Sequence, residues 1–157
     1  MSFTEATPAI AKTYNVDTTK AWENLDDSTR TLMGTGVYEC TIKLSAAELK
    51  KGNRWTIDLG DVRESARVYV NDSLIGCAWA VPYRLSFANL LHKGNNKIRI
   101  EVTNLPANRI SELDRQGYKW RKFDEINVVD INYKKTSYAD WTPVASGLNS
   151  EVKLIKE

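Results

Sequence analysis

Apolar and polar residues alternate with a period of two through most of the chain from residue 36 onward. In residues 37–44, Tyr38, Cys40, Ile42 and Leu44 fall on one face, and charged or hydroxyl side chains fall between them. A two-residue period puts one face of a strand in a core and the other in water, as in antiparallel sheets that pack face to face. The same alternation recurs in residues 55–59, 68–71, 83–87, 98–102, 129–133 and 152–154. The sequence therefore predicts an all-β sandwich.

Turn residues separate the alternating segments at short intervals. Residues 51–53, 71–73 and 93–96 contain Gly, Asn or Asp, which tolerate the positive φ of tight turns. The 157 residues fit one domain, 1–157, of which residues 1–21 show no regular pattern.

Helical structure is predicted only in short connectors. Residues 45–48 form a capping box, and residues 88–92 resemble one helical turn that ends before Gly94. Residues 26–28 (Asp-Asp-Ser) are suited to begin a brief helix that contains Leu32.

The charge composition excludes several classes of protein. The chain has 22 basic and 20 acidic residues, a net charge of +2, and no long run of one sign, so no nucleic-acid footprint is expected. No apolar run approaches the ~20 residues of a membrane span, and the first residues lack the features of a signal peptide. Of the two cysteines, we expect Cys40 to be a buried free thiol, while a Cys40–Cys77 disulfide stays open if the protein is exported.

Eight pieces of the sequence occur in an order that resembles a known family. They are Trp22, Asp26-Asp27, GTGVY (34–38), IDLGDV (57–62), ARVYVND (66–72), IGCAWAVPYRLSF (75–87), KGNNKIRIEVTNLPANRI (93–110) and SGLNSEVKL (146–154). Together they resemble the galactose-binding-like jelly-roll domain of glycoside hydrolases. The likeness is greatest to the sugar-binding-type domain of family 2 and to the C-terminal sandwich of α-L-rhamnosidase-like enzymes. It covers residues 22–154, with Asn71-Asp72 where the family usually has Asn-Gly.

The resemblance implies a jelly-roll β-sandwich that serves as a non-catalytic accessory module of a longer glycoside hydrolase. The catalytic carboxylates would lie in another domain, and the parent would be periplasmic or extracellular. The implied partners are a glycan or the neighbouring catalytic domain.

Aromatic and arginine side chains outside the alternating segments are the candidate sugar-binding residues. Aromatic rings stack on the C–H faces of sugars, while polar groups at the rim read the hydroxyls. Residues 106–124 form the longest stretch without strand alternation, and we expect a functional loop there. The predicted carbohydrate-binding residues are Trp79, Arg84, Arg109, Tyr118, Trp120 and Trp141.

Other residues in these segments have structural explanations. We expect Trp22 and Trp55 in the core, and Asn104 and Asn108 in hydrogen bonds to the backbone. Arg109 has two interpretations, because it is suited either to loop hydrogen bonds or to a sugar hydroxyl or carboxylate.

Two other functions remain open at this stage. Aromatic and arginine residues are also enriched at protein interfaces, so the chain could be a purely structural packing module. A small stand-alone lyase could use Tyr118 with Arg121, and a glycosidase would need two facing carboxylates from Asp124, Glu125, Asp130 and Asp140. We expect no catalytic residue and no cofactor in this chain; a structural calcium ion on Asp26, Asp27 and Asp140 is the alternative.

Overall fold

A computed structural model describes residues 1–16, 20–49, 53–122, 131–132 and 134–157, and these are mostly β-strands. The strands are β1 (Ser2–Thr7), β2 (Met33–Leu44), β3 (Arg54–Asp58), β4 (Val62–Arg63), β5 (Ser65–Val70), β6 (Ser73–Ala78), β7 (Arg84–Ala88), β8 (Gly94–Thr103), β9 (Gly147–Leu148) and β10 (Lys153–Lys156). The helices are the 3-10 turn η1 (Trp22–Asn24), α1 (Asp27–Arg30) and α2 (Ala107–Arg115). This is the all-β sandwich that the alternation predicts.

The larger sheet has five antiparallel strands in the order β1-β2-β8-β5-β6. Its central strands bury every second side chain: Ala66, Val68 and Val70 of β5 are fully buried, and Ile98 and Ile100 of β8 are nearly so. Asn71 and Asp72, both at positive φ, connect β5 to β6 as the turn chemistry predicts.

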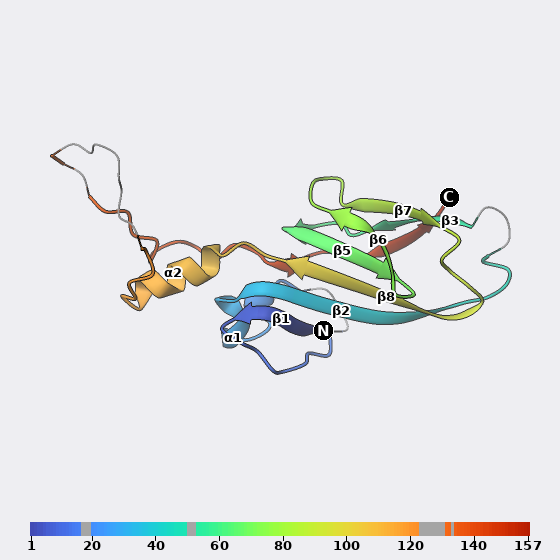
Figure 1. Cartoon of the computed structure of the whole chain (residues 1–157), viewed down its shortest axis with the longest axis horizontal. Helices are drawn as coiled ribbons and strands as arrows, with labels where there is room; N and C mark the ends of the chain where they lie inside the picture. Colours follow the sequence, from blue (N-terminus) through green and yellow to red (C-terminus); the bar gives the residue numbers. More distant parts are fainter. Residues whose placement is uncertain (17–19, 50–52, 123–130, 133) are drawn as a thin grey trace.

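The smaller sheet has three strands in the order β10-β3-β7 and packs against the larger one, with β4 and β9 as a separate pair (Figure 1). Trp55, Ile57 and Phe87 of the smaller sheet are buried between the layers. Because three strands face five, the smaller sheet leaves part of the larger sheet's inner face uncovered.

Four local predictions are wrong or incomplete. Residues 1–21 are not irregular throughout, since β1 pairs with β2; only Phe3 of β1 is buried, so the strand has no alternating signature. Residues 106–124 are not one loop, because they contain α2. Residues 88–92 form no helical turn, since β7 ends at Ala88. In residues 129–133, Ile131 lies in a turn and is exposed, while Val129 and Tyr133 lie outside the described residues.

Trp22 organises one end of the core. It is fully buried, its ring meets Phe3 edge-on at 5.0 Å between centroids, and its indole N–H donates to the Tyr38 hydroxyl at 2.7 Å. The Tyr38 hydroxyl in turn accepts from the Leu148 N–H. Trp22 and Trp55 are both core residues, as predicted.

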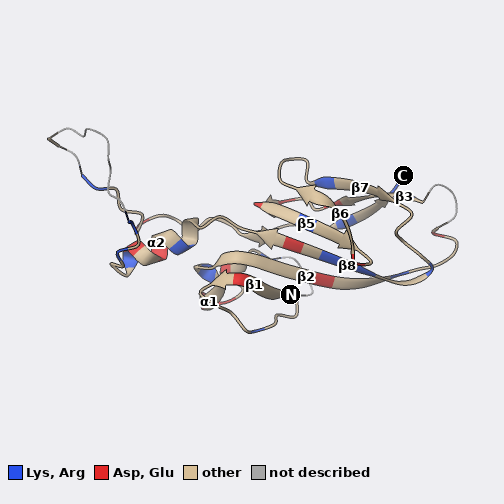
Figure 2. Ribbon diagram, viewed as in Figure 1, with Lys and Arg blue, Asp and Glu red and all other residues tan. Residues whose placement is uncertain are grey.

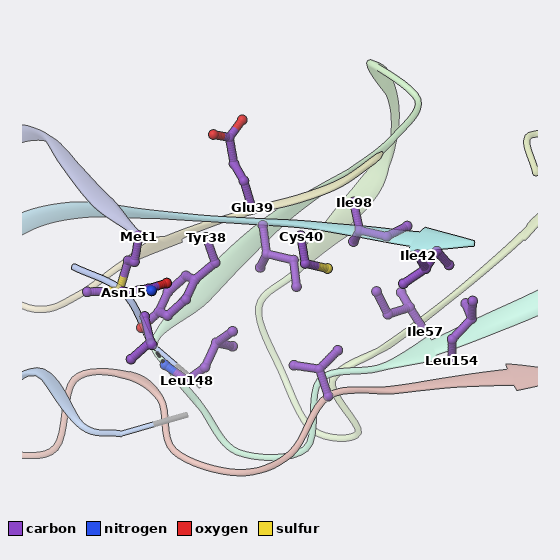
Figure 3. Close-up of a pocket in the computed structure, with 13 residues that line it drawn as sticks. Met1, Asn15, Tyr38, Glu39, Cys40, Ile42, Ile57, Ile98, Leu148 and Leu154 are labelled. Atoms are coloured by element: carbon purple, nitrogen blue, oxygen red, sulfur yellow. Dashed lines mark hydrogen bonds between the residues drawn. The ribbon is translucent and has the colours of Figure 1, made fainter. Parts of the chain in front are cut away.

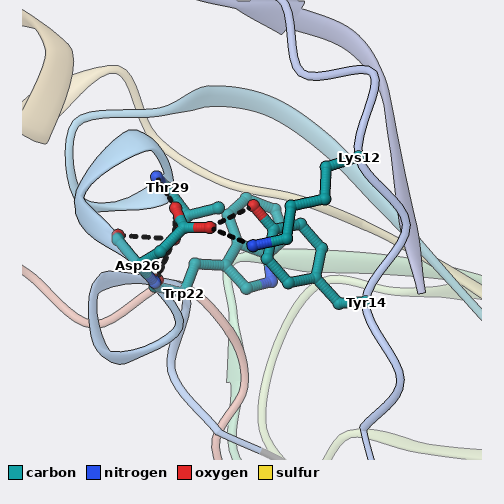
Figure 4. A network of polar contacts seen from close by, with 5 residues as sticks. All are labelled: Lys12, Tyr14, Trp22, Asp26 and Thr29. Carbon is teal, nitrogen blue, oxygen red and sulfur yellow. Dashed lines mark hydrogen bonds and ion pairs between the residues drawn. The ribbon is translucent and has the colours of Figure 1, made fainter.

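A polar clamp ties the N-terminal segment to α1 (Figure 4). The Asp26 side chain accepts from the Thr29 N–H and caps the helix, and the backbone of Asp26 donates to the Thr29 hydroxyl. The predicted cap is therefore present, but the helix ends at Arg30 and does not contain Leu32 as predicted. The second carboxylate oxygen of Asp26, Oδ2, accepts from the Tyr14 hydroxyl at 2.7 Å and from the Lys12 ammonium at 3.1 Å. The Tyr14 hydrogen bond is the main cause that lowers the pKa of Asp26 to about 2. Burial, followed by Asp26, raises the pKa of Tyr14 to about 12.

The clamp makes stability depend on pH. Because the folded pKa of Asp26 is depressed, its contribution is present above about pH 4 and is lost as the pH falls toward about 2. Tyr14→Phe is expected to lower the free energy of unfolding by about 1 kcal/mol at pH 7, and the difference from the unaltered protein should shrink as acid protonates Asp26. Urea unfolding between pH 7 and pH 2 measures both proteins. Tyr118→Phe, at an exposed tyrosine, is the control; an equal loss at pH 2 and pH 7 would contradict this role of the clamp.

In the part of the chain that the structure covers, no helix is long and apolar enough to cross a membrane.

Candidate functional site

The most prominent departure from the sandwich is a projection that begins with α2. Residues 107–145, called the arm here, leave the end of β8 and return to β9; 123–130 and 133 are outside the described residues. Figure 1 shows α2 and the following segment extending away from the sheets. The predicted loop is therefore a helix-based arm.

Buried asparagines fix the base of the arm. The Asn108 side chain donates to the Val144 carbonyl and accepts from the Val144 N–H, both at 2.8 Å, so it joins the outgoing and returning limbs. Asn104 accepts from the Gly34 N–H and donates to Leu32 O and Ser146 Oγ. Both amides thus have the structural role that the sequence favours.

An aromatic cluster lies farther along the arm. The Tyr138 ring lies 6.1 Å from the Trp120 ring and 4.5 Å from the Trp141 ring, measured between centroids. The Arg121 guanidinium stands over the rings of Trp120 and Tyr138 at 5.0 and 4.9 Å, and it donates to the Thr136 carbonyl. Trp141 is half exposed, so the cluster presents aromatic surface to solvent.

Asp114 links the two limbs beneath this cluster. Its carboxylate accepts from the Trp120 indole N–H at 2.5 Å and from the Tyr138 N–H at 2.7 Å. The hydrogen bond from the Tyr138 backbone N–H, followed by that from the Trp120 indole N–H, lowers the pKa of Asp114. Asp114 is therefore a charged brace that orients Trp120.

A cavity of about 350 Å³ opens beside the brace, between the two limbs. Tyr118, at 66% exposed, stands at it as a ring that a ligand can reach. The lining residues are Asp114, Gly117, Tyr118, Lys119, Trp120, Arg121, Lys135, Thr136 and Ser137. Aromatic faces, hydroxyls and cations thus meet in one place, which is the composition that a sugar site requires.

Two of the predicted site residues do not belong to this arrangement. Trp79 lies in the β6–β7 connection over the sandwich, is 76% exposed, and does not line the arm cavity. Arg84 opens β7 and is held by Asp58, with guanidinium–carboxylate distances of 2.7 and 2.8 Å. The structure therefore places Tyr118 and Trp120 at the arm cavity and Trp141 in the adjoining aromatic cluster, whereas Trp79 and Arg84 belong to neither.

Arg109, the remaining predicted residue, lies on α2 near the base of the arm. Its Nε is buried and has no hydrogen-bond partner among the described residues. It does not line the arm cavity, so it is not a contact residue of that site.

A second hollow, of about 290 Å³, lies between the sheets where the smaller one falls short (Figure 3). Aliphatic side chains dominate it, with Ile42, Ile98 and Leu154 among them, and Glu39 points away from it. Its lining is poor in groups that read sugar hydroxyls. The arm cavity is therefore the better candidate for a glycan.

The predicted burial of Cys40 is wrong, because the smaller sheet does not cover this part of the larger sheet. Cys40 is on the inward face of β2, but it lines this hollow and is exposed, and partial burial raises the pKa of its thiol. Cys77 is also exposed and free. Strands β8 and β5 separate the strands of the two cysteines, a span of about 14 Å, whereas disulfide Cα atoms lie within about 7 Å. No disulfide joins them.

The residues proposed for calcium do not form a group, and three of the four acids considered for catalysis lie outside the described residues. Among the described residues, no three His, Cys, Asp or Glu side chains gather as a metal site, and Asp26 serves the clamp. Asp140 is exposed, while Asp124, Glu125 and Asp130 lie outside the described residues.

Sequence reasoning missed two contributors to the arm site, Asp114 and Tyr138. They lie 24 residues apart, and no local pattern joins them. The sequence suggests Arg121 only as a lyase residue beside Tyr118, and not as a contact between the two limbs. The recurrence of aromatic residues on both sides of the unpatterned segment was the available signal.

Known proteins share this architecture. Residues 21–148 match the family described as "Glycosyl hydrolase 2 galactose-binding domain-like". A protein of Formosa agariphila named "Putative beta-glucuronidase" is 28% identical over 155 residues, which cover 88% of this chain and 13% of that protein.

Solved structures agree with this match. A rhamnosidase from Novosphingobium sp. PP1Y is 27% identical with a TM-score of 0.66, over 88% of this chain and 12% of that one. A family 2 β-galacturonidase from Eisenbergiella tayi shares the fold at 14% identity and a TM-score of 0.52, over 87% of this chain and 19% of its own. The chain thus spans about an eighth of its first relatives. With four fifths of its residues within the family match, this chain belongs to the glycosyl hydrolase 2 galactose-binding domain-like family.

Proposed function

We propose that this chain is a non-catalytic, carbohydrate-binding-like accessory module of a glycoside hydrolase. The arm holds part of a glycan and positions it for a catalytic domain elsewhere in the parent. The observation that carries the proposal is a cavity on a projecting arm that Tyr118 and Trp120 line, next to an aromatic cluster in which Tyr138 joins Trp120 to Trp141.

The relatives support the parent's chemistry. The names of the Formosa, Novosphingobium and Eisenbergiella proteins all refer to enzymes that cleave glycosides, and each is several times longer than this chain. A glycan substrate is an extended chain, so an arm that reaches beyond the sandwich is suited to a site some distance from bond cleavage. The parent acts in the periplasm or outside the cell, where polymeric glycans occur.

The arm is better equipped for binding than for catalysis. A glycosidase needs two carboxylates that face each other across the scissile bond, about 5–9.5 Å apart. Among the described residues that line the arm cavity, Asp114 is the one acid, and both of its oxygens already accept hydrogen bonds from the arm. Stacking and hydrogen bonding remain as the chemistry of the described lining.

Isothermal titration calorimetry of the 157-residue chain tests the proposal, with galactotetraose, tetragalacturonic acid and a sulfated carrageenan tetrasaccharide as probes. We expect at least one probe to bind. Tyr118→Ala removes an exposed ring without breaking an internal contact among the described residues, and it should weaken binding about tenfold, which corresponds to about 1.4 kcal/mol.

Trp79→Ala is the matched control, because it removes an equally exposed ring from another part of the fold. Its affinity should stay unchanged. The proposal fails if no probe binds, or if Trp79→Ala abolishes binding while Tyr118→Ala does not.

One observation favours structural packing as a second role. Trp79 and Val81 are strongly exposed apolar residues two positions apart in the β6–β7 connection. Exposed apolar side chains that lie close together are typical of protein interfaces. The two roles are compatible, since they use different surfaces of the chain.

A further inference from the structure

Most of the charged residues that line the arm cavity are basic. Lys119, Arg121 and Lys135 contribute cationic groups from both limbs, and Asp114 is the one acid in the described part of the lining. Figure 2 shows basic residues on the arm beyond α2, whereas acidic and basic residues are mixed on α2 itself.

Both carboxylate oxygens of Asp114 are already engaged in hydrogen bonds within the protein. Asp114 Oδ1 accepts from the Trp120 indole N–H, and Oδ2 accepts from the Tyr138 N–H. These bonds hold the carboxylate against the protein, and its depressed pKa keeps it ionised as a structural brace. The acid therefore organises the aromatic wall and leaves ligand recognition to other groups.

Lys119 is the cation best placed to meet a ligand. Its side chain is exposed and lines the cavity, and in the sequence it lies between Tyr118 and Trp120. Within the described part of the chain it forms no ion pair. Arg121 has a different task, because it spans the limbs through Thr136 O and lies over two rings. A mobile ammonium beside an aromatic face can pair with an anionic substituent of a stacked sugar.

We infer that the arm cavity selects anionic glycans: a sugar ring stacks on Tyr118, and its carboxylate or sulfate pairs with Lys119. The hydroxyls of Thr136 and Ser137 on the opposite limb complete the lining and can bind sugar hydroxyls. The inference rests on the proposed glycan-binding function and adds the class of ligand. Carboxylate and sulfate share the chemistry that Lys119 recognises, so the test must separate them.

The three tetrasaccharides named above separate these possibilities by calorimetry. At low salt, tetragalacturonic acid or the sulfated tetrasaccharide should bind at least about tenfold more tightly than galactotetraose, and whichever of the two binds identifies the anion. Raising the salt to about 0.5 M should reduce that preference severalfold, because screening weakens exposed charge pairs.

Lys119→Gln is the decisive variant, with Lys93→Gln in the exposed β7–β8 turn as its matched control. Lys119→Gln should reduce the affinity for the anionic probe about tenfold and leave that for galactotetraose unchanged; Lys93→Gln should change neither. Thermal unfolding of each variant shows whether the fold is intact.

The outcomes distinguish the two proposals. Equal binding of all three probes, unaffected by Lys119→Gln, overturns anion selectivity and leaves the glycan-binding function standing. Preference for galactotetraose has the same meaning. If no probe binds, both proposals fail.

Discussion

Gly147→Ala is expected to destabilise the domain by about 4 kcal/mol and to lower its melting temperature by roughly 8–16 °C. Gly147 lies in β9 at φ +91°, and a Cβ there would meet Trp22 Nε1 at 2.2 Å and Tyr38 Oη at 2.6 Å. Both atoms belong to the buried hydrogen bond that fixes Trp22. The Trp22 ring cannot retreat, because it is fully buried and also faces Gly36, where a Cβ would come within 2.5 Å of its Cζ2.

Gly94→Ala separates the steric clash from backbone strain. Gly94 has a similar φ of +99°, but a Cβ there would meet nothing within 4 Å. Only the cost of positive φ remains, about 1–2 kcal/mol. Calorimetric melting of the two variants gives the comparison. Equal losses would show that Trp22 tolerates the added methyl group, and the close packing described for this end of the core would be wrong.

The sequence predicts well those strands that have neighbours on both sides and bury one face in the core. In β5, Ala66, Val68 and Val70 point into the core while Arg67 and Tyr69 point outward, so periodicity reads directly as structure. β1 is different, since a strand at the sheet edge with one buried side chain, Phe3, has no periodic signal to offer.

The sequence pattern does not predict helix α2 for a related reason. A surface helix is normally recognised by an apolar stripe, but the buried residues of α2 are Asn108 and Ser111. These bury polar groups because the helix docks through hydrogen bonds to the returning limb, as Asn108 does with Val144. A contact with a segment 36 residues away leaves no mark on local spacing.

The candidate site shows the same division between local and distant information. Tyr118, Trp120 and Trp141 could be selected because they are aromatic residues outside the strand pattern. The placement of Trp120 and Trp141 near each other depends on Asp114 and Tyr138 meeting across the arm, whereas Trp79 and Arg84 lie in and after the β6–β7 connection. Residue type thus predicts the chemistry of a site, whereas the long-range contacts decide its membership.

Asn96→Asp is expected to cost about 3–5 kcal/mol at neutral pH, because it places a negative charge at a fully buried position. The Asn96 Oδ1 accepts from Asn71 Nδ2 and the His92 N–H, and its Nδ2 donates to the carbonyls of His92 and Gly94. An aspartate keeps the two acceptor bonds but turns a bare oxygen toward two carbonyl oxygens. Burial and this repulsion both favour the protonated acid, so the folded state should raise the pKa of the new carboxyl group.

Because of the raised pKa, the loss of stability should depend on pH, whereas a simple loss of packing would not. The variant's deficit should be small below about pH 4, where the unfolded carboxyl group is also protonated, and it should grow as the pH rises until the folded-state group ionises. Urea unfolding from pH 3 to pH 8 measures the trend, and Asn95→Asp, at the exposed neighbouring position, is the matched control. A deficit that does not change with pH would mean that the site relaxes to admit water, and that the four hydrogen bonds of Asn96 do not fix the turn before β8.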